Sequence, residues 1–249
     1  MKGMIIAANW KAYVESAAKA KKLFAAAKRL ASRTGQEIIL APPPPFLGML
    51  AAGNRSKVAF AAQDVSTATG GAHTGEVTAG TAREAGATYA IVGHSERRAA
   101  GDDNDIVSLK LQHTLAQGLT PILCIGERVR DEDAQYLVFL REEISSAFTA
   151  LSQKERMTVL IAYEPIWAIG KTAADSIGPS DLAEMVLYIR KVLSEFLPGK
   201  GSSRARILYG GSVEADNAGA LAQGGIDGFL IGHAATNTES FTKLVRAVV

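Results

Sequence analysis

Short apolar segments recur along the chain, and segments with a helical pattern separate them. The apolar segments are rich in β-branched residues and lack a polar alternation, and there are eight of them: Met4–Ala8, Glu37–Ala41, Val58–Ala62, Tyr89–Gly93, Thr120–Ile125, Thr158–Tyr163, Arg206–Tyr209 and Gly228–Ile231. Strands of a parallel sheet have this pattern when helices cover one face and a packed interior fills the other. We therefore expect eight parallel strands.

Helical signals occupy the intervening segments. They cover Ser16–Arg33, Pro44–Gly53, Thr81–Ala85, Asp103–Gln117, Asp131–Leu151, Pro179–Phe196, Asp216–Gln223 and Thr238–Val248. Alternation of strand and helix favours right-handed parallel crossovers, and eight repeats are the number that closes a (β/α)8 barrel. The alternative is a doubly wound open sheet, but the first strand is followed by Asn9-Trp10-Lys11 and not by a Gly-x-Gly-x-x-Gly turn. We expect an α/β protein with one barrel domain over residues 1–249.

The composition limits the classes of partner that this domain is expected to bind. The 249 residues are 47% hydrophobic and 21% charged, which allows a large core, and the net charge is only +2. Such a charge gives no strong field toward nucleic acid or a membrane surface, and no apolar run reaches the roughly 20 residues of a membrane span. The single cysteine, Cys124, excludes an internal disulfide and is typical of a reducing compartment. We expect a soluble, cytoplasmic protein in which Cys124 is a small buried hydrophobe.

One apolar segment ends in an acid. The strand predicted at Thr158–Tyr163 is followed by Glu164 and then by Pro165, which cannot donate to a strand ladder. The apolar residues up to Gly170 predict a hydrophobic loop. A carboxylate below such a loop could act as a base whose proton affinity changes when water leaves, or it could simply face solvent.

Other polar residues follow the remaining strands, and in a barrel the carboxyl ends of all strands meet at one face. These residues are Asn9, Lys11, Gln63, His94–Arg98, Glu127, Gly210–Ser212, Gly232 and His233. The glycine turns let the backbone approach a phosphate, although a tight turn alone would also explain them. His94, at a strand-to-helix junction, could be a neutral donor or a core histidine. Lys11 could equally lie on the surface, and Glu96 could belong to a salt-bridged scaffold with Arg97 and Arg98.

Several of these residues fall within longer motifs. The motifs are Asn9-Trp10-Lys11, Thr74-Gly75-Glu76, Gly93-His94-Ser95-Glu96-Arg97-Arg98, Pro121–Glu127, Ala162-Tyr163-Glu164-Pro165-Ile166-Trp167-Ala168-Ile169-Gly170 and Tyr209-Gly210-Gly211-Ser212. In this order and spacing they resemble the triosephosphate isomerase family over nearly the whole chain, and the resemblance implies a TIM barrel.

The resemblance also implies an activity. The family interconverts dihydroxyacetone phosphate and glyceraldehyde 3-phosphate, in glycolysis and gluconeogenesis, through an enediolate and without a metal or an organic cofactor. By resemblance, Glu164 moves the proton between two carbons, neutral His94 polarises the carbonyl and Asn9 assists it. Lys11 balances the charge of the phosphate and of the developing oxyanion.

Further residues are implied to bind and enclose this substrate. Asn9, Lys11 and the amides of Gly170, Ser212, Gly232 and His233 would bind it, Glu96 would hold Lys11, and Ser95 would hold Glu164 before closure. The residues implied to close as a lid are Pro165, Ile166, Trp167, Ala168, Ile169, Gly170, Lys171, Thr172 and Ala173. Loop 63–80, with Thr74 near its tip, resembles the loop through which the family forms homodimers.

The chain departs from the family pattern in four places. Lys171-Thr172-Ala173 follows Gly170 directly where a Thr-Gly pair is usual, and extra residues follow before the next helix. His233 replaces a glycine, so its amide can bind phosphate only if its φ and ψ suit a non-glycine residue. Ala12 and Tyr13 replace the common Met and Asn, and Asp102 stands where a glutamate is usual.

Two alternatives to the triose activity remain open at this stage. The altered lid and His233 suggest an isomerase of a four-carbon ketose phosphate (a tetrulose phosphate) that uses the same residues. The other alternative is a barrel that binds phosphate without catalysis and serves as an interaction scaffold. Relative rates on triose and tetrulose phosphates would distinguish the four-carbon isomerase from a triose isomerase. Weak binding of phosphoglycolate would favour the non-catalytic scaffold.

Overall fold

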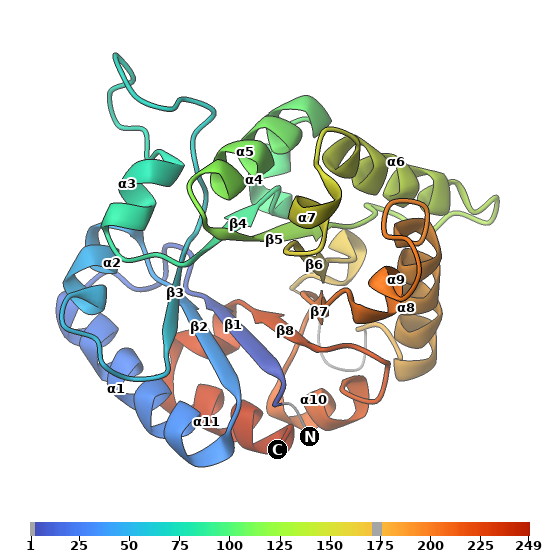
Figure 1. The fold of residues 1–249 in the computed structure, drawn as a ribbon. Helices are drawn as coiled ribbons and strands as arrows, with labels where there is room; N and C mark the ends of the chain where they lie inside the picture. The colour runs from blue at the N-terminus through green and yellow to red at the C-terminus, as the bar shows by residue number, and fades with distance from the viewer. Residues whose placement is uncertain (1–2, 171–175) are drawn as a thin grey trace.

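The computed structural model describes residues 3–170 and 176–249, and its strands close into one parallel barrel (Figure 1). The eight strands of this described part are β1 (Ile5–Asn9), β2 (Glu37–Ala41), β3 (Ala59–Ala62), β4 (Tyr89–Val92), β5 (Thr120–Ile125), β6 (Leu160–Tyr163), β7 (Ile207–Tyr209) and β8 (Gly228–Ile231). Each pairs with the next in sequence, and β1 pairs with β8 from Ile5↔Gly228 to Ala8↔Ile231. The expected (β/α)8 TIM barrel is confirmed.

Successive side chains of each strand enter two different cores. In β1, Ile5 and Ala7 point into the barrel interior, whereas Ile6 and Ala8 pack against the helices outside. Because both faces are buried, the strands carry no polar alternation, which is why the sequence showed continuous apolar runs. Cys124 lies in the inner core and is 1% exposed, as expected for a small hydrophobe.

Helices surround the barrel (Figure 1). They are α1 (Ala17–Thr34), α2 (Pro44–Ala51), α3 (Ala79–Glu84), α4 (Ser95–Ala99), α5 (Asn104–Ala116), α6 (Gln135–Thr149), α7 (Gln153–Arg156), α8 (Pro179–Leu193), α9 (Gly201–Arg204), α10 (Ala215–Leu221) and α11 (Thr238–Ala247). Side chains at their N-termini explain several starts: Ser16 accepts from the Lys19 amide and Asp103 from the Ile106 amide. Asn237 accepts from the amides of Glu239 and Ser240.

The prediction was wrong at some boundaries. The helix expected from Asp131 begins at Gln135, because Asp131 instead accepts from the Gln135 amide at 2.6 Å and from the Tyr136 amide at 3.1 Å. Among the residues that the structure describes, the short elements α7 and α9 and the 3-10 helices η1 (Ile166–Ala168) and η3 (His233–Thr236) were not predicted. Each has three or four residues, which is too short to show a helical repeat.

The segment between β3 and α3 leaves the barrel surface. Figure 1 shows it as an extended projection, and residues 69–76 are exposed, including Thr74. In residues 3–170 and 176–249, no helix is both long and apolar enough to cross a membrane.

Candidate active site

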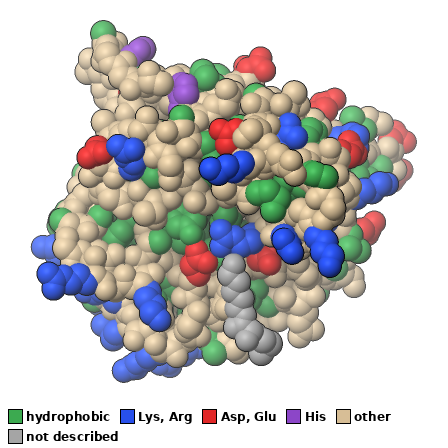
Figure 2. Space-filling model, in the orientation of Figure 1, with side chains coloured by type: hydrophobic (Ala, Val, Ile, Leu, Met, Phe, Trp, Pro, Cys, Tyr) green, Lys and Arg blue, Asp and Glu red, His purple; other side chains and the backbone are tan. Residues whose placement is uncertain are grey.

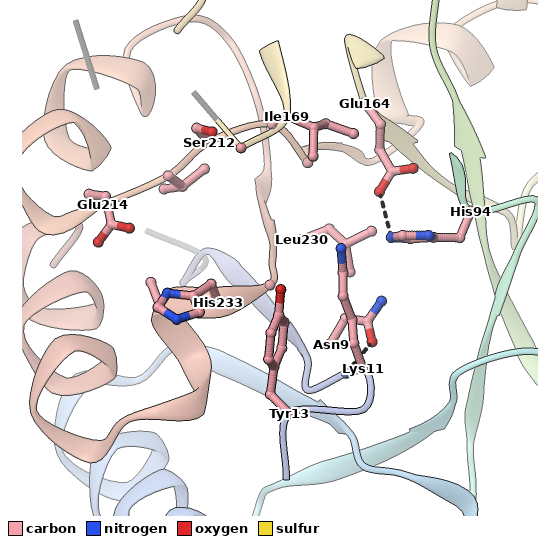
Figure 3. Close-up of a pocket in the computed structure, with 16 residues that line it drawn as sticks. Asn9, Lys11, Tyr13, His94, Glu164, Ile169, Ser212, Glu214, Leu230 and His233 are labelled. Carbon is pink, nitrogen blue, oxygen red and sulfur yellow. Dashed lines mark hydrogen bonds and ion pairs between the residues drawn. The ribbon is translucent and has the colours of Figure 1, made fainter. Parts of the chain in front are cut away.

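A pocket of about 370 Å³ opens at the carboxyl ends of the strands (Figure 3). It contains all eight residues predicted to react with or bind the substrate, and its lining is Asn9, Lys11, Tyr13, His94, Glu164, Ile169, Gly170, Gly210, Gly211, Ser212, Val213, Glu214, Leu230, Gly232, His233 and Ala234. Figure 3 shows His94 and Glu164 on one side of this pocket and Ser212, Glu214 and His233 on the other.

The Glu164 carboxylate is buried, accepts one hydrogen bond and lies close to His94. Its own amide donates to the Ile125 carbonyl at 2.8 Å, which continues the sheet one residue past β6 and fixes where the side chain starts. The side chain is 4% exposed; Oε1 lies 3.3 Å from Nε2 of His94, and Oε2 accepts from the amide of Ser95 at 3.1 Å. The contact predicted between Ser95 and Glu164 is therefore made by the Ser95 backbone.

His94 is oriented by the helix that follows it. Its Nδ1 accepts from the Glu96 amide at 3.1 Å, at the start of α4. A nitrogen that accepts carries no proton, so in this geometry the ring has its proton on Nε2, which points at Glu164. The imidazole is thus a neutral donor aimed into the pocket, as its position at a helix start had suggested.

Lys11 adopts a strained backbone at the pocket edge. Its φ of 47° is uncommon for a non-glycine residue, and the Asn9 Oδ1 stabilises it by accepting from the Lys11 amide at 3.0 Å. Gln63 donates from Nε2 to the Lys11 carbonyl at 2.9 Å. The Lys11 ammonium reaches Glu96 Oε1 at 2.7 Å, the contact that the resemblance implied for Glu96.

The glycine turn after β7 provides space for a neighbouring side chain. A Cβ at Gly210 would lie 2.8 Å from Cγ of Glu164, so any other residue would displace this carboxylate. The Gly210 amide donates to the Tyr163 carbonyl at 2.8 Å and so faces no ligand. The interpretation of this glycine as an open phosphate cradle is corrected: it makes room for Glu164.

Open amides occur two residues further along, at Ser212, and after β8. Within residues 3–170 and 176–249, the amides of Ser212, Gly232 and His233 donate to no backbone or side-chain acceptor. Among the same described residues, only Lys11 and Ala134 are non-glycines with positive φ, so His233 has an ordinary backbone. A histidine at this position therefore leaves its amide able to face an anion.

The first half of the predicted lid is anchored by a buried acid. Glu127 Oε1 accepts from Trp167 Nε1 and from the Tyr163 hydroxyl, both at 2.8 Å, and Ser212 Oγ donates to the Ala168 carbonyl at 3.0 Å. These bonds tie η1 to the ends of β5, β6 and β7. Lys171, Thr172 and Ala173, the rest of the predicted lid, fall outside the described residues.

Two buried charge networks support α4, and the sequence reasoning missed their central members. Lys110 of α5 donates to Asp64 at 2.8 Å and to Asp102 at 2.6 Å, and Arg97 lies 3.0 Å from Asp64. Asp102, the fourth departure from the family pattern, thus keeps a buried partner. The sequence did carry a signal for this network. Lys110 lies on the same face of the predicted helix as the core residues Leu111 and Thr114, where a buried lysine needs an acidic partner.

The second network pairs Arg98 with Glu143 of α6. Arg98 Nε lies 3.2 Å from Glu143 Oε1, and Glu143 Oε2 accepts from the Gly126 amide at 2.8 Å. Burial raises the pKa of Glu143 to about 7, although Arg98 and the Gly126 amide both lower it. Gly126 packs against the Glu164 backbone, so this acid supports the segment that carries the candidate base.

This raised pKa predicts a pH-dependent stability. Between about pH 4.5 and pH 7 the folded chain keeps a proton on Glu143 that the unfolded chain releases, so the free energy of unfolding falls as the pH rises through this window. In denaturant titrations from pH 5 to pH 7, Glu143→Gln should remove a slope of up to about 1.4 kcal/mol per pH unit. The exposed neighbour provides the control, because Glu142→Gln should keep the wild-type slope. Equal slopes in all three proteins would contradict the assignment.

A closed parallel barrel in which a buried carboxylate faces a neutral imidazole, with a lysine and open amides in the same pocket, defines an enzyme of the proton-transfer class on a (β/α)8 scaffold. Comparison with known proteins makes this specific. The family model for triosephosphate isomerase matches residues 4–248. The chain is 40% identical to the triosephosphate isomerase of Halorhodospira halophila, with 99% of this chain and 98% of the relative covered. It is 38% identical to that of Thermus thermophilus, with 99% of each covered. The chain belongs to the triosephosphate isomerase family.

Proposed function

We propose that this chain interconverts dihydroxyacetone phosphate and D-glyceraldehyde 3-phosphate, as an intramolecular aldose-ketose isomerase of glycolysis and gluconeogenesis. The observation that carries the proposal is the 3.3 Å contact between His94 Nε2 and Glu164 Oε1 inside a pocket that also holds Lys11. A base and a neutral donor at this spacing suit removal of a proton beside a carbonyl, where the carbon that loses the proton and the carbonyl oxygen lie two bonds apart.

The reaction needs only a proton transfer. Glu164 removes a proton from the carbon next to the carbonyl, and the electron pair moves to the carbonyl oxygen, which gives an enediolate. The Nε2–H group of His94 stabilises and protonates this oxygen, and Lys11 balances its charge, with Asn9 as a further donor. Glu164 then returns its proton to the former carbonyl carbon, while the hydroxyl on the other carbon gives its proton back to Nε2 of His94 and becomes the new carbonyl. The isomerisation is thus complete without oxidant, reductant or cofactor.

Substrate binding uses the opposite side of the pocket. The open amides of Ser212, Gly232 and His233 support a phosphate site there, and we include Gly170 and Lys11 in it. Pro165–Gly170, together with Lys171, Thr172 and Ala173, would close over the bound substrate. On closure the Glu164 carboxylate would exchange the Ser95 amide for the substrate, and exclusion of water would protect the enediolate.

A coupled assay on glyceraldehyde 3-phosphate tests the activity, with Glu164→Ala as the reference for residual turnover. A wild-type rate no higher than that of the variant would overturn the proposal. Rates on tetrulose phosphates measured in parallel address the four-carbon alternative, and binding of phosphoglycolate addresses the scaffold alternative. Neither alternative is favoured by an observation on the described residues or by the relatives.

We further propose that one domain, residues 1–249, carries the activity as a homodimer in the cytoplasm. A lone buried thiol such as Cys124 suits a reducing compartment. The projecting segment supports the dimer, because residues 69–76 are exposed and Glu76 is their only acidic or basic residue apart from His73. Figure 2 shows few charged side chains on this projection. An exposed, weakly charged loop of this length suits insertion into a second copy.

A charge at the tip should break this dimer. We expect Thr74→Arg to change the particle from two subunits to one at micromolar concentration, because a buried unpaired guanidinium is costly. Sedimentation equilibrium gives the mass directly. Glu132→Arg, a substitution at an exposed position before α6, serves as the control and should leave two subunits. A monomeric wild type, or a dimeric Thr74→Arg protein, would contradict the proposed interface.

A further inference from the structure

Two aromatic side chains form one wall of the pocket. The rings of Tyr13 and His233 lie edge to face, with centroids 5.5 Å apart and an interplanar angle of 82°. Figure 3 shows them on the side away from His94 and Glu164, with Tyr13 between His233 and Lys11 and its hydroxyl directed into the pocket. Neither ring has a part in the proton transfer.

The position of His233 gives its side chain access to a bound anion. Its own amide and that of Gly232 are open, and the imidazole lines the same cavity. The family pattern has a glycine here, which offers an amide alone. A histidine adds a donor and, once protonated, a positive charge a few bonds from the same amide.

We propose that the imidazole of His233, held by Tyr13, is an additional and protonation-dependent contact for the phosphate group of the substrate. This inference rests on the proposed function only in taking a phosphate monoester as the ligand. Protonated His233 strengthens the binding of a dianion, and neutral His233 leaves the amides and Lys11 to bind it. Substrate affinity therefore depends on pH through a residue outside the proton-transfer pair.

The charged groups around this imidazole come from four parts of the chain. Lys11, Tyr13 and Lys19 follow β1, and Lys19 Nζ donates to the Tyr13 carbonyl at 2.9 Å. Glu214, on the same cavity, and Asp216 follow β7. On α11, Glu239 and Lys243 are 2.9 Å apart and pair with each other. Across the pocket stand His94 and Glu164. Lys11 and Glu214 oppose each other in sign, so the charge of His233 changes the balance at this wall.

Sulfate is a suitable probe, because it stays a dianion from pH 5.5 to pH 8.5, whereas phosphate itself titrates in this range. The sulfate dissociation constant can be measured from the chemical shifts of the Ser212 and Gly232 amides, at constant ionic strength made up with chloride. For wild type we expect about tenfold tighter binding at pH 5.5 than at pH 8.5, the scale of one added charge near a dianion.

His233→Gln keeps a side-chain donor but cannot gain charge, and its sulfate affinity should be nearly constant over the same range. His113→Gln, on α5 and outside the pocket, is the matched control and should retain the wild-type dependence. Linkage supplies a second readout, because binding that favours the protonated ring must move the His233 titration to higher pH when sulfate saturates the site. The chain has four histidines, so the signal lost in His233→Gln identifies the ring.

Tyr13 variants test how the ring is held. Tyr13→Phe keeps the edge-to-face contact and should keep the pH dependence, whereas Tyr13→Ala should weaken it. If His233→Gln follows the wild-type curve, or if sulfate leaves the His233 titration unmoved, the inference is overturned while the proposed function stands. If sulfate shifts neither the Ser212 nor the Gly232 amide at any pH, the phosphate site itself is absent, which also overturns the proposed function.

Discussion

Replacement of Glu164 with Gln should lower kcat by about 10³-fold or more, with a small change in KM. The amide keeps the size of the side chain but cannot remove a proton, and general base catalysis contributes on the order of 10²- to 10⁴-fold. Steady-state kinetics in both directions measure the loss. Because Glu164 is buried beside Gly210, an isosteric change should also leave the fold intact, which thermal unfolding would verify.

Glu164→Asp is the matched variant for this prediction. It keeps the carboxylate but withdraws it by one methylene, and a displacement of about 1 Å costs on the order of 10²-fold when the reacting atoms are aligned. We therefore expect Asp to fall between wild type and Gln. If Gln retained more activity than Asp, the position of the side chain would matter and its basicity would not, and Glu164 would not be the base.

Replacement of Lys11 with Met should lower kcat/KM by about 10³-fold, with contributions from both kcat and KM. The ammonium is placed to face the substrate phosphate and the oxyanion, and loss of one group that stabilises a developing charge costs on the order of 10²- to 10³-fold before the phosphate contact is counted. Glu96, its present partner, has a side chain that is 61% exposed, so it stays solvated in the variant. Stability should change little.

Lys19→Met is the control for this loss of charge. Lys19 also lies near the start of the chain and contacts Tyr13, but only through the Tyr13 carbonyl, and it does not line the pocket. Its replacement removes the same charge and should reduce kcat/KM by less than threefold at moderate salt, where exposed charges are screened. Similar losses of kcat/KM in Lys11→Met and Lys19→Met would indicate that only the overall positive charge of the protein matters, and Lys11 would then have no specific role.

The barrel was predictable because its signals are local and repeated. Eight apolar runs separated by helical segments leave few topologies, and capping residues such as Ser16 and Asp103 mark helix starts within one or two residues. The start of α6 was misplaced because Asp131 is an acid in the right pattern whose side chain caps the helix from outside it. The sequence pattern does not show whether an aspartate lies in the first turn of a helix or caps the helix from a position before it.

The sequence predicted which residues form the site better than it predicted the contacts that hold them. Strand ends converge by topology, so Lys11, His94 and Glu164 had to meet once the barrel closed. Their backbone partners follow from turn geometry, which a sequence does not carry. The Ser95 amide that holds Glu164, and the room that Gly210 leaves for it, are both of this kind.

Buried charges were missed for a different reason. Glu143 and Lys110 occupy core-facing positions of α6 and α5, where an apolar side chain is usual. Their spacing shows that they are buried, but the partners Arg98, Asp64 and Asp102 lie on other elements. A polar residue within an apolar helical stripe therefore predicts a buried ion pair without naming the second member.

The central claim is that Glu164 carries a proton between neighbouring carbons of a triose phosphate. Proton NMR of glyceraldehyde 3-phosphate incubated with the enzyme in deuterium oxide tests it most directly, because a proton held by the Glu164 carboxyl can exchange with solvent before it is returned, whereas a direct hydride shift between the carbons cannot introduce deuterium. We predict rapid formation of dihydroxyacetone phosphate that carries deuterium at the carbon that gains the proton, and a rate lower by about 10³-fold with Glu164→Gln. Conversion at equal rates by both proteins, or a wild-type product without any deuterium, would contradict the account.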